Sequence, residues 1–305
     1  MGLSELSGFP LFSVRIGDHR GVACGRGMMD QTGWTSFWAH GRWWKAVLLV
    51  VVYLALYQLA GLGIGRLFGG MIDRENTFSS PASVFFSIGA PLVVGAVLLL
   101  AFAASVNWTK SVFARQPVRG RWWMWIFVVL AVVPIVLRFF GIDYASYGAA
   151  VIVTSLLVGL LIGFVEEFLY RGIVVTILRN GGHREWSVAV LSSLFFALSH
   201  TVNLISGQEV VVVALTVVMT FGFGLMMYLV LRATGNIVWP MLIHAFTDPT
   251  TFLATGGVDS TNGAAHSPVL DLAAPFNYIF VIAALIALIF IRGRADDLQP
   301  TTGRP

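Results

Sequence analysis

Five acids and histidines lie inside apolar stretches of this 305-residue chain, where ionisable groups are rare. They are three acids, Glu166, Glu167 and Asp248, and two histidines, His200 and His244. An ionisable group near the centre of a bilayer costs roughly 2.5–3.5 kcal/mol on insertion scales, so such residues tend to mark functional sites. A carboxylate with an imidazole can activate a water molecule, and further polar groups can stabilise an oxyanion. The residue types therefore predict hydrolytic chemistry, provided that the five groups meet in one polar cavity.

The local spacing predicts a different environment for each group. Glu167 and Arg171 are four residues apart, so on a helix they share a face and are expected to pair. Glu166 lies about 100° further round the helix, so the two glutamates are not expected to face one point. This leaves Glu166 free to act as a general base. His244 and Asp248 are also four residues apart and are expected to share a face.

The elements that must position these groups are apolar stretches long enough to cross a membrane. The chain is 57% hydrophobic and 11% charged, whereas soluble domains are about 45–50% apolar and 25% charged. A helix needs about 20 apolar residues to cross about 30 Å of hydrocarbon. Eight stretches satisfy this length: 46–68, 83–104, 122–140, 149–169, 188–205, 210–231, 237–253 and 273–291. The sequence predicts an all-α polytopic membrane helix bundle with about eight transmembrane helices.

The distribution of basic residues predicts how the bundle is oriented. Lys and Arg concentrate in the N-terminal arm, in the even-numbered loops and in the C-terminal tail, while the odd-numbered loops carry little besides Arg74. The loop cations include Lys110, Arg115, Arg119, Arg121, Arg179, Arg184 and Arg232. Because cytoplasmic loops are enriched in Lys and Arg, both termini are expected in the cytoplasm. The net charge of +4 is therefore assigned to membrane topology, and no nucleic-acid partner is expected.

Helix rise predicts how the polar groups could meet. Glu166 lies about 14 residues, or about 21 Å, from the glycine turn at 181–182, and His200 lies about as far along the next helix. These two side chains are therefore expected at one height. His244 lies about 8 residues, or about 12 Å, beyond the turn at 233–236. It is expected lower, unless that turn dips into the membrane.

Three motifs in this region resemble those of a known family of intramembrane proteins. Residues 166–172 read EEFLYRG and are similar to the EExxxR motif of the CPBP family, the CAAX prenyl protease and bacteriocin-processing proteins. Residues 196–200 read FALSH and resemble its FxxxH motif, and residues 244–248 read HAFTD and resemble its HxxxN/D motif. The three motifs occur in the family's order within about residues 150–250.

This resemblance implies a membrane-embedded endopeptidase of the Rce1 type. In such enzymes, the residues corresponding to Glu166 and His200 activate a water molecule, and those corresponding to His244 and Asp248 hold the oxyanion. The remaining motif residues, Glu167, Arg171 and Phe196, are expected to support them. An ionised carboxylate at position 248 would repel an oxyanion, so Asp248 must be protonated, orient His244 or act in another way.

Cofactor and function alternatives stay open at this level. Glu166, His200 and His244 could form a zinc site with two histidines and one carboxylate, but the chain has no HExxH, and metal-independent catalysis is the favoured prediction. The expected partners are the lipid bilayer and a membrane-associated peptide or protein substrate, which could be lipidated. The alternatives are a non-catalytic immunity or regulatory protein of the same family, and a proton-coupled transporter that uses the acids and histidines as a relay.

The remaining predictions concern organisation and location. Residues 1–41 are expected to form a flexible cytoplasmic arm, residues 42–294 the transmembrane domain with its catalytic core at about 150–250, and residues 295–305 a disordered tail. The arm shows no cleavable signal peptide. The Gly- and Ala-rich composition and the lack of organellar signals favour a bacterial inner (plasma) membrane.

Overall fold

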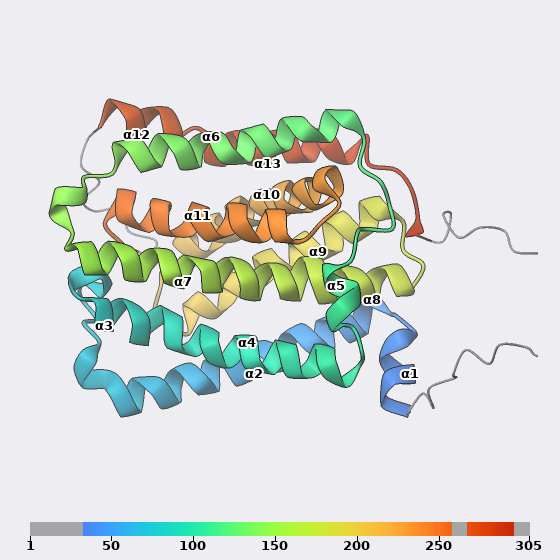
Figure 1. The fold of residues 1–305 in the computed structure, drawn as a ribbon, viewed down its shortest axis with the longest axis horizontal. Helices are drawn as coiled ribbons and strands as arrows, with labels where there is room; N and C mark the ends of the chain where they lie inside the picture. The colour runs from blue at the N-terminus through green and yellow to red at the C-terminus, as the bar shows by residue number, and fades with distance from the viewer. Residues whose placement is uncertain (1–32, 258–266, 296–305) are drawn as a thin grey trace, which may run out of the picture.

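Helices form every regular element in the part of the chain that the computed structural model describes, residues 33–257 and 267–295 (Figure 1). The first half contains α1 (Gly33–Ala39), α2 (Trp43–Phe68), η1 (Gly69–Met71), η2 (Thr77–Ser79), α3 (Pro81–Val84), η3 (Phe85–Gly89), α4 (Ala90–Ser105), α5 (Thr109–Phe113), η4 (Trp122–Met124) and α6 (Trp125–Gly141). The second half contains η5 (Tyr144–Ser146), α7 (Ala149–Glu167), η6 (Phe168–Val174), α8 (Val175–Asn180), α9 (Glu185–Ser199), η7 (His200–Leu204), α10 (Val210–Thr234), α11 (Val238–Thr255), α12 (Pro268–Ala273) and α13 (Phe276–Leu288).

Seven helical stretches among the described residues are long and apolar enough to cross a membrane: Trp43–Met71, Pro81–Ser105, Trp122–Gly141, Ala149–Asn180, Glu185–Leu204, Val210–Thr234 and Pro268–Leu288. The protein is therefore a multi-pass membrane protein, as predicted. The expected span at 237–253 is present as α11, which is less apolar because it carries His244, Asp248 and several threonines. The expected fourth span, 149–169, continues to Asn180 as one stretch of 32 residues.

Helix α7 lies at the centre of the bundle, between α4 on one side and α11 on the other (Figure 1). Two glycines allow α7 and α11 to approach closely. A Cβ atom built on Gly163 would lie 2.3 Å from the carbonyl oxygen of Met241, and one on Gly159 would lie 2.4 Å from that of Ala245. Small residues four apart permit this kind of contact in membrane helices. The contact matters because α11 carries His244 immediately before Ala245.

Directly after Glu167 the α7 helix changes to the π-helical segment η6. All seven of its residues are buried, and so are residues 224–232 of α10. These two segments form the core of one end of the bundle. Single π-helical turns often occur at functional sites because they change the direction of side chains on an otherwise regular helix.

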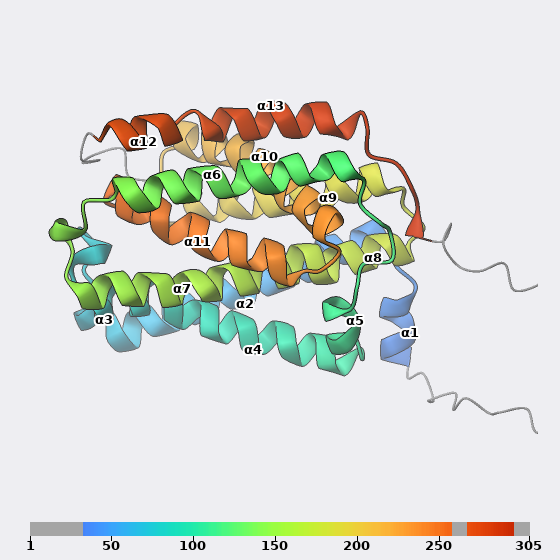
Figure 2. The same cartoon turned by 45° about the horizontal axis from the view of Figure 1, so that its top comes forward.

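The loops predicted to be basic gather at this same end, on the right in Figure 1 and in the turned view of Figure 2. The loop before α9 meets the C-terminal segment, where the Glu185 N–H donates to the Gly293 carbonyl at 2.9 Å. The loop before α6 meets the α10–α11 turn, where the Gln116 N–H donates to the Gly235 carbonyl at 2.9 Å. The clustering is the one that the charge pattern predicts for a single side of the membrane.

Two of the arginines predicted to lie in loops, Arg179 and Arg232, instead lie in α8 and α10 and are buried in an ion network. Arg179 donates to both carboxylate oxygens of Glu185 at 2.9 and 2.8 Å, and Arg232 donates to the same carboxylate at 2.9 Å. The Tyr228 hydroxyl donates to that carboxylate as well. Glu185 is fully buried. These two cations therefore hold the ends of α8, α9 and α10 together, because the buried carboxylate needs positive partners.

Part of the predicted N-terminal arm is helical. Residues 33–39 form α1, whose Trp38 is buried with its ring 5.0 Å from that of Phe102. The predictions for residues 1–32 and for the tail after residue 295 lie outside the described residues.

Candidate active site

A cavity of about 600 Å³ inside the bundle brings together four of the predicted residues. Glu166 of α7, His200 at the start of η7, and His244 and Asp248 of α11 all line it. A smaller neighbouring pocket of about 160 Å³ shares Glu166 and His200 with the first. Residues from three separate helical stretches therefore face one space, which the motif order alone does not require.

Three carboxylates lie close to the imidazole of His244. Its Nε2 lies 3.5 Å from Oε2 of Glu166 and 3.5 Å from Oδ2 of Asp248. Its Nδ1–H donates to Oε1 of Glu167 at 2.8 Å. His244 is 2% exposed, whereas the side chains of Glu166 and Asp248 are 28% and 26% exposed toward the cavity. The histidine is thus enclosed, and two of its three acids are open to a ligand.

The prediction that the two glutamates would not face one point is wrong. Glu166 and Glu167 approach the same imidazole ring, one at each nitrogen. An imidazole presents its two nitrogens in different directions, so neighbouring carboxylates about 100° apart on a helix can reach it from two sides. A helical wheel gives the directions in which side chains leave one helix. It does not account for a partner on a neighbouring helix, such as His244 of α11, that lies between two of those directions.

The expected pair between Glu167 and Arg171 forms and has a second function. Arg171 Nη1 donates to Oε1 of Glu167 at 3.0 Å, and both side chains are fully buried. Arg171 Nη2 donates to the Gly224 carbonyl of α10 at 2.9 Å. Since the same Glu167 oxygen accepts from His244, Arg171 and Glu167 connect α10 to α11 through the ring of that histidine.

Phe196, the first residue of the FxxxH motif, forms the floor between the two histidines. Its ring lies 5.1 Å from the ring of His200 and 5.9 Å from that of His244, both in edge-to-face geometry. The guanidinium of Arg171 stacks over the same ring at 4.7 Å. The large aromatic side chain therefore sets the separation of the two imidazoles.

The hydrogen bond of His200 determines which of its nitrogens carries the proton. Its Nδ1 lies 3.0 Å from the carbonyl oxygen of Phe196. A backbone carbonyl can only accept, so Nδ1 carries the hydrogen and donates it. In the neutral ring, Nε2 then keeps its lone pair, which is the arrangement that a general base needs.

The α10–α11 turn explains how His244 reaches this depth. The turn ends short of the bundle end that α8 reaches (Figure 1), and the loop before α6 covers it. Arg232 Nη2 donates to the Arg119 carbonyl at 3.0 Å, and Gly120 packs so closely that a Cβ there would lie 2.0 Å from the Arg232 carbonyl oxygen. The set-back turn is the alternative that the sequence left open, and it raises His244 to the level of Glu166.

Sequence reasoning missed one charged residue of the cavity, Arg138. It lies in the last turn of α6, is 6% exposed and lines the cavity together with Asn277 of α13. The signal was available, because an arginine inside an apolar span is as costly as an acid. The sequence prediction did not include Arg138 because it considered only acids and histidines inside the apolar spans.

The predicted zinc ligands do not form a metal site in this arrangement. Within residues 33–257 and 267–295, no group of three or more His, Cys, Asp or Glu side chains is placed to hold a metal ion. Glu166 Oε2 and His244 Nε2 lie 3.5 Å apart, and the Nδ1 of each histidine bonds a protein acceptor, so Nε2 is the nitrogen of each ring that is left for the cavity. As placed, these three side chains are not grouped closely enough to share one ion.

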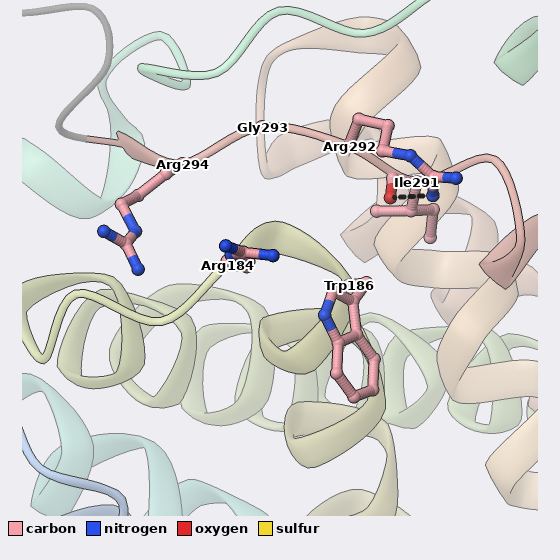
Figure 3. A pocket seen from close by; sticks show the side chains of 6 residues that line it. All are labelled: Arg184, Trp186, Ile291, Arg292, Gly293 and Arg294. Carbon is pink, nitrogen blue, oxygen red and sulfur yellow. Dashed lines mark hydrogen bonds between the residues drawn. The ribbon is translucent and has the colours of Figure 1, made fainter.

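A second hollow, of about 450 Å³, lies at the basic end of the bundle and has different chemistry (Figure 3). Arg184 and Trp186 line it from the start of α9, and the C-terminal segment 291–294 lines it from the other side. One of its arginines, Arg292, donates to the Ile291 carbonyl at 3.0 Å. Among the residues that the structure describes, no acid or histidine lines this hollow, so this described lining lacks the groups that water activation requires.

Comparison with known families identifies the central segment. Residues 148–250, about a third of the chain, match the family model described as type II CAAX prenyl endopeptidase Rce1-like. This segment is an Rce1-like domain. The match confirms the resemblance drawn from the three motifs, all of which lie within it. No curated protein sequence matches the chain.

The limits of the Rce1-like domain coincide with the elements that form the site. It begins at the start of α7 and ends within α11, so it contains all seven predicted site residues. The chain thus carries a domain of the CAAX-type intramembrane proteases within a multi-pass membrane protein. Arg138 and Asn277, which line the same cavity, lie outside this domain.

Proposed function

We propose that this protein is an intramembrane endopeptidase that hydrolyses a peptide bond in a membrane-associated substrate. The single observation that carries the proposal is the cavity shared by Glu166, His200, His244 and Asp248 within the Rce1-like domain. A cavity with convergent acids and imidazoles inside an apolar bundle is a suitable site for acid–base chemistry.

Glu166 and His200 are the pair that activates water. Both line the cavity, and Nε2 of His200 is free of the hydrogen bond that holds Nδ1. A water molecule between the Glu166 carboxylate and this nitrogen would donate a proton to one of them as its oxygen attacks the substrate carbonyl. The carbon–nitrogen bond then breaks, the proton passes to the leaving amine, and the products are one carboxylate and one amine.

His244 is the group that faces the developing oxyanion. Its Nδ1–H is held by Glu167, which fixes the ring orientation, so a proton on Nε2 would point toward the cavity. An oriented donor of this kind contributes about 2.7–4 kcal/mol to the transition state. Asp248 lies 3.5 Å from the same nitrogen, and its proposed role is to orient the imidazole. In this role Asp248 acts through His244 and need not touch the substrate oxygen.

The decisive experiment is Glu166→Gln in the purified protein, reconstituted in liposomes and supplied with a fluorogenic peptide library. The variant keeps the side-chain volume and removes the base, so we expect turnover to fall by about 10²–10⁴-fold. Glu75→Gln is the matched control, because Glu75 is an exposed acid in the loop after α2. Full turnover in Glu166→Gln would refute the assignment.

The same preparation separates the remaining alternatives. Metal-independent catalysis predicts unchanged turnover after chelation, and turnover lost on chelation and restored by zinc would contradict it. A wild-type protein that cleaves no peptide, but loses proton-coupled uptake with Glu166→Gln, would favour the transporter. A wild-type protein with neither activity would favour a non-catalytic immunity or regulatory role.

A further inference from the structure

Three arginines line the hollow at the basic end of the bundle, which is called the arginine hollow here. Arg184 comes from the start of α9, and Arg292 and Arg294 come from the C-terminal segment (Figure 3). Arg184 and Arg294 are opposite each other in an antiparallel β-bridge, which places opposite Cα atoms about 4.5–5.5 Å apart. The bond from the Glu185 N–H to the Gly293 carbonyl, at 2.9 Å, joins the same two segments. The backbone therefore holds like charges close together.

The described part of the protein does not neutralise these charges. Within residues 33–257 and 267–295, the side chains of Arg184 and Arg294 have no acceptor, and Arg292 donates to the carbonyl of its own neighbour, Ile291, at 3.0 Å. Glu185 is adjacent, but its buried carboxylate already pairs with two other arginines. That network carries one net positive charge and does not cancel the field of the hollow. Like charges opposite each other are destabilising, and an anion bound between them would remove the repulsion.

The arginine hollow lies where two membrane spans end. Trp186 is the second residue of the span Glu185–Leu204, and the C-terminal lining begins three residues past the span Pro268–Leu288. This position is the level of the lipid headgroups. The indole of Trp186 is 50% exposed, as is typical of tryptophan at a membrane–water boundary. Ile289 and Phe290, which are 63% and 56% exposed, come directly before the lining, so acyl chains can contact them.

We propose that the arginine hollow binds the headgroup of an anionic phospholipid. A guanidinium can donate to two phosphate oxygens at once, and basic pockets between membrane helices bind anionic headgroups in this way. The start of α9 also favours an anion, because its helix dipole is positive there and no side chain caps it. The volume of about 450 Å³ is in the range of sites for small ligands.

The surroundings of the hollow favour a lipid over a soluble anion. Inorganic phosphate would meet the same arginines, but it would gain nothing from the exposed indole of Trp186 or from the apolar side chains of Ile289 and Phe290. A phospholipid uses both features, because its headgroup and its acyl chains lie on the two sides of the membrane–water boundary. The bound headgroup would also join α9 to the C-terminal segment, since the arginines come from both.

The test measures lipid binding to the purified full-length protein in detergent micelles by native mass spectrometry. The two probes are phosphatidylglycerol, whose headgroup is anionic, and phosphatidylcholine, whose headgroup has no net charge, with the same acyl chains. Each arginine near an anionic headgroup contributes about fivefold in affinity. The three arginines therefore predict that phosphatidylglycerol binds about 100-fold more tightly than phosphatidylcholine. Equal affinities for the two lipids would overturn the proposal.

Variants then assign the preference to the arginine hollow. A triple variant is expected to bind both lipids alike: Arg184→Gln, Arg292→Gln and Arg294→Gln. The matched control removes three exposed cations elsewhere at the same end and should keep the preference: Lys110→Gln, Arg119→Gln and Arg121→Gln. Arg294→Gln alone should lose about fivefold, which keeps the test valid if the triple variant has a lower thermal midpoint. A control that loses as much as the hollow variant would mean a diffuse surface charge and would refute the site.

Further probes distinguish the other possible occupants. Inorganic phosphate that binds as tightly as phosphatidylglycerol would mean a site for a free anion, and a glutamate-rich peptide that displaces the lipid would mean a protein partner. Asp296 and Asp297 follow the hollow in the sequence, outside the described residues. A lipid preference that is found only after Asp296→Asn with Asp297→Asn would mean that the chain's own acids occupy the arginines. Each of these results would overturn the proposal. None of them depends on peptidase turnover, so lipid binding is tested independently of the proposed function.

Discussion

The contact between Gly163 of α7 and α11 gives a quantitative prediction for Gly163→Ala. The added Cβ would lie 2.3 Å from the Met241 carbonyl oxygen and 2.7 Å from the Ala245 nitrogen, whereas ordinary contact begins at 3.4 Å. Both neighbours are backbone atoms, so a rotamer change cannot relieve the clash. The helices must separate by about 1 Å. His244 precedes Ala245 and moves with it, away from Glu166.

A displacement of about 1 Å in a catalytic group costs about 100-fold in rate. We therefore expect Gly163→Ala to lower peptide turnover in liposomes by about that factor. The overpacking should lower the free energy of unfolding by about 1–3 kcal/mol, which leaves room for a folded protein with a reduced thermal midpoint. Turnover and midpoint are measured on the same preparation, so that loss of activity is compared at a temperature where the variant is folded.

Gly65→Ala in α2 is the matched control, because a Cβ there meets nothing within 4 Å. It should keep both turnover and stability, since alanine is also the better helix former. Gly159→Ala, where the Cβ would lie 2.4 Å from the Ala245 carbonyl oxygen, should behave like Gly163→Ala. A folded Gly163→Ala protein with wild-type turnover would refute the argument that the α7–α11 spacing positions His244.

Two further substitutions test the polar networks. Asp248→Asn keeps the size of the side chain and its contact with His244 Nε2, so most of the peptidase activity should remain. Asp248→Ala should lower peptidase turnover by about 10²–10³-fold. An inactive Asp248→Asn enzyme would mean that the charge itself is needed. Glu185→Gln leaves two buried arginines without a counter-charge, so the free energy of unfolding should fall by about 3–5 kcal/mol. Glu75→Gln is the control. A thermal midpoint of Glu185→Gln equal to that of the control would show that the network contributes little to stability.

Much of the site could be predicted because its chemistry is carried by residues that are costly in an apolar segment. Glu166, His200 and His244 stand out for this reason. The Glu167–Arg171 and His244–Asp248 pairs follow from the i, i+4 spacing on a helix. The contact between Glu167 and His244 could not be predicted in this way. These residues are 77 positions apart, and local spacing does not report how two helices approach each other.

Sequence reasoning was less successful for three buried arginines, Arg138 and the two that pair with Glu185. Arg179 and Arg232 were counted as loop cations because they flank apolar stretches, yet each is buried against Glu185. Arg138 lies inside a span and was not counted. A charge at a helix end is exposed or buried according to what the next loop covers, and the loops at 114–121 and 289–295 come from distant parts of the chain.

The sequence by itself determined that this is a helical membrane protein and which side chains are available for hydrolysis, because hydrophobic length and the cost of buried charge are properties of single segments. Only the tertiary structure decided that Glu166 and Glu167 approach the two nitrogens of one imidazole. It also decided that the α10–α11 turn lies deep enough to bring His244 to the level of Glu166, and that Arg138 lines the same cavity. Each of these depends on the spacing and depth of helices relative to one another. That spacing is set by glycine contacts and loop coverage between segments remote in sequence.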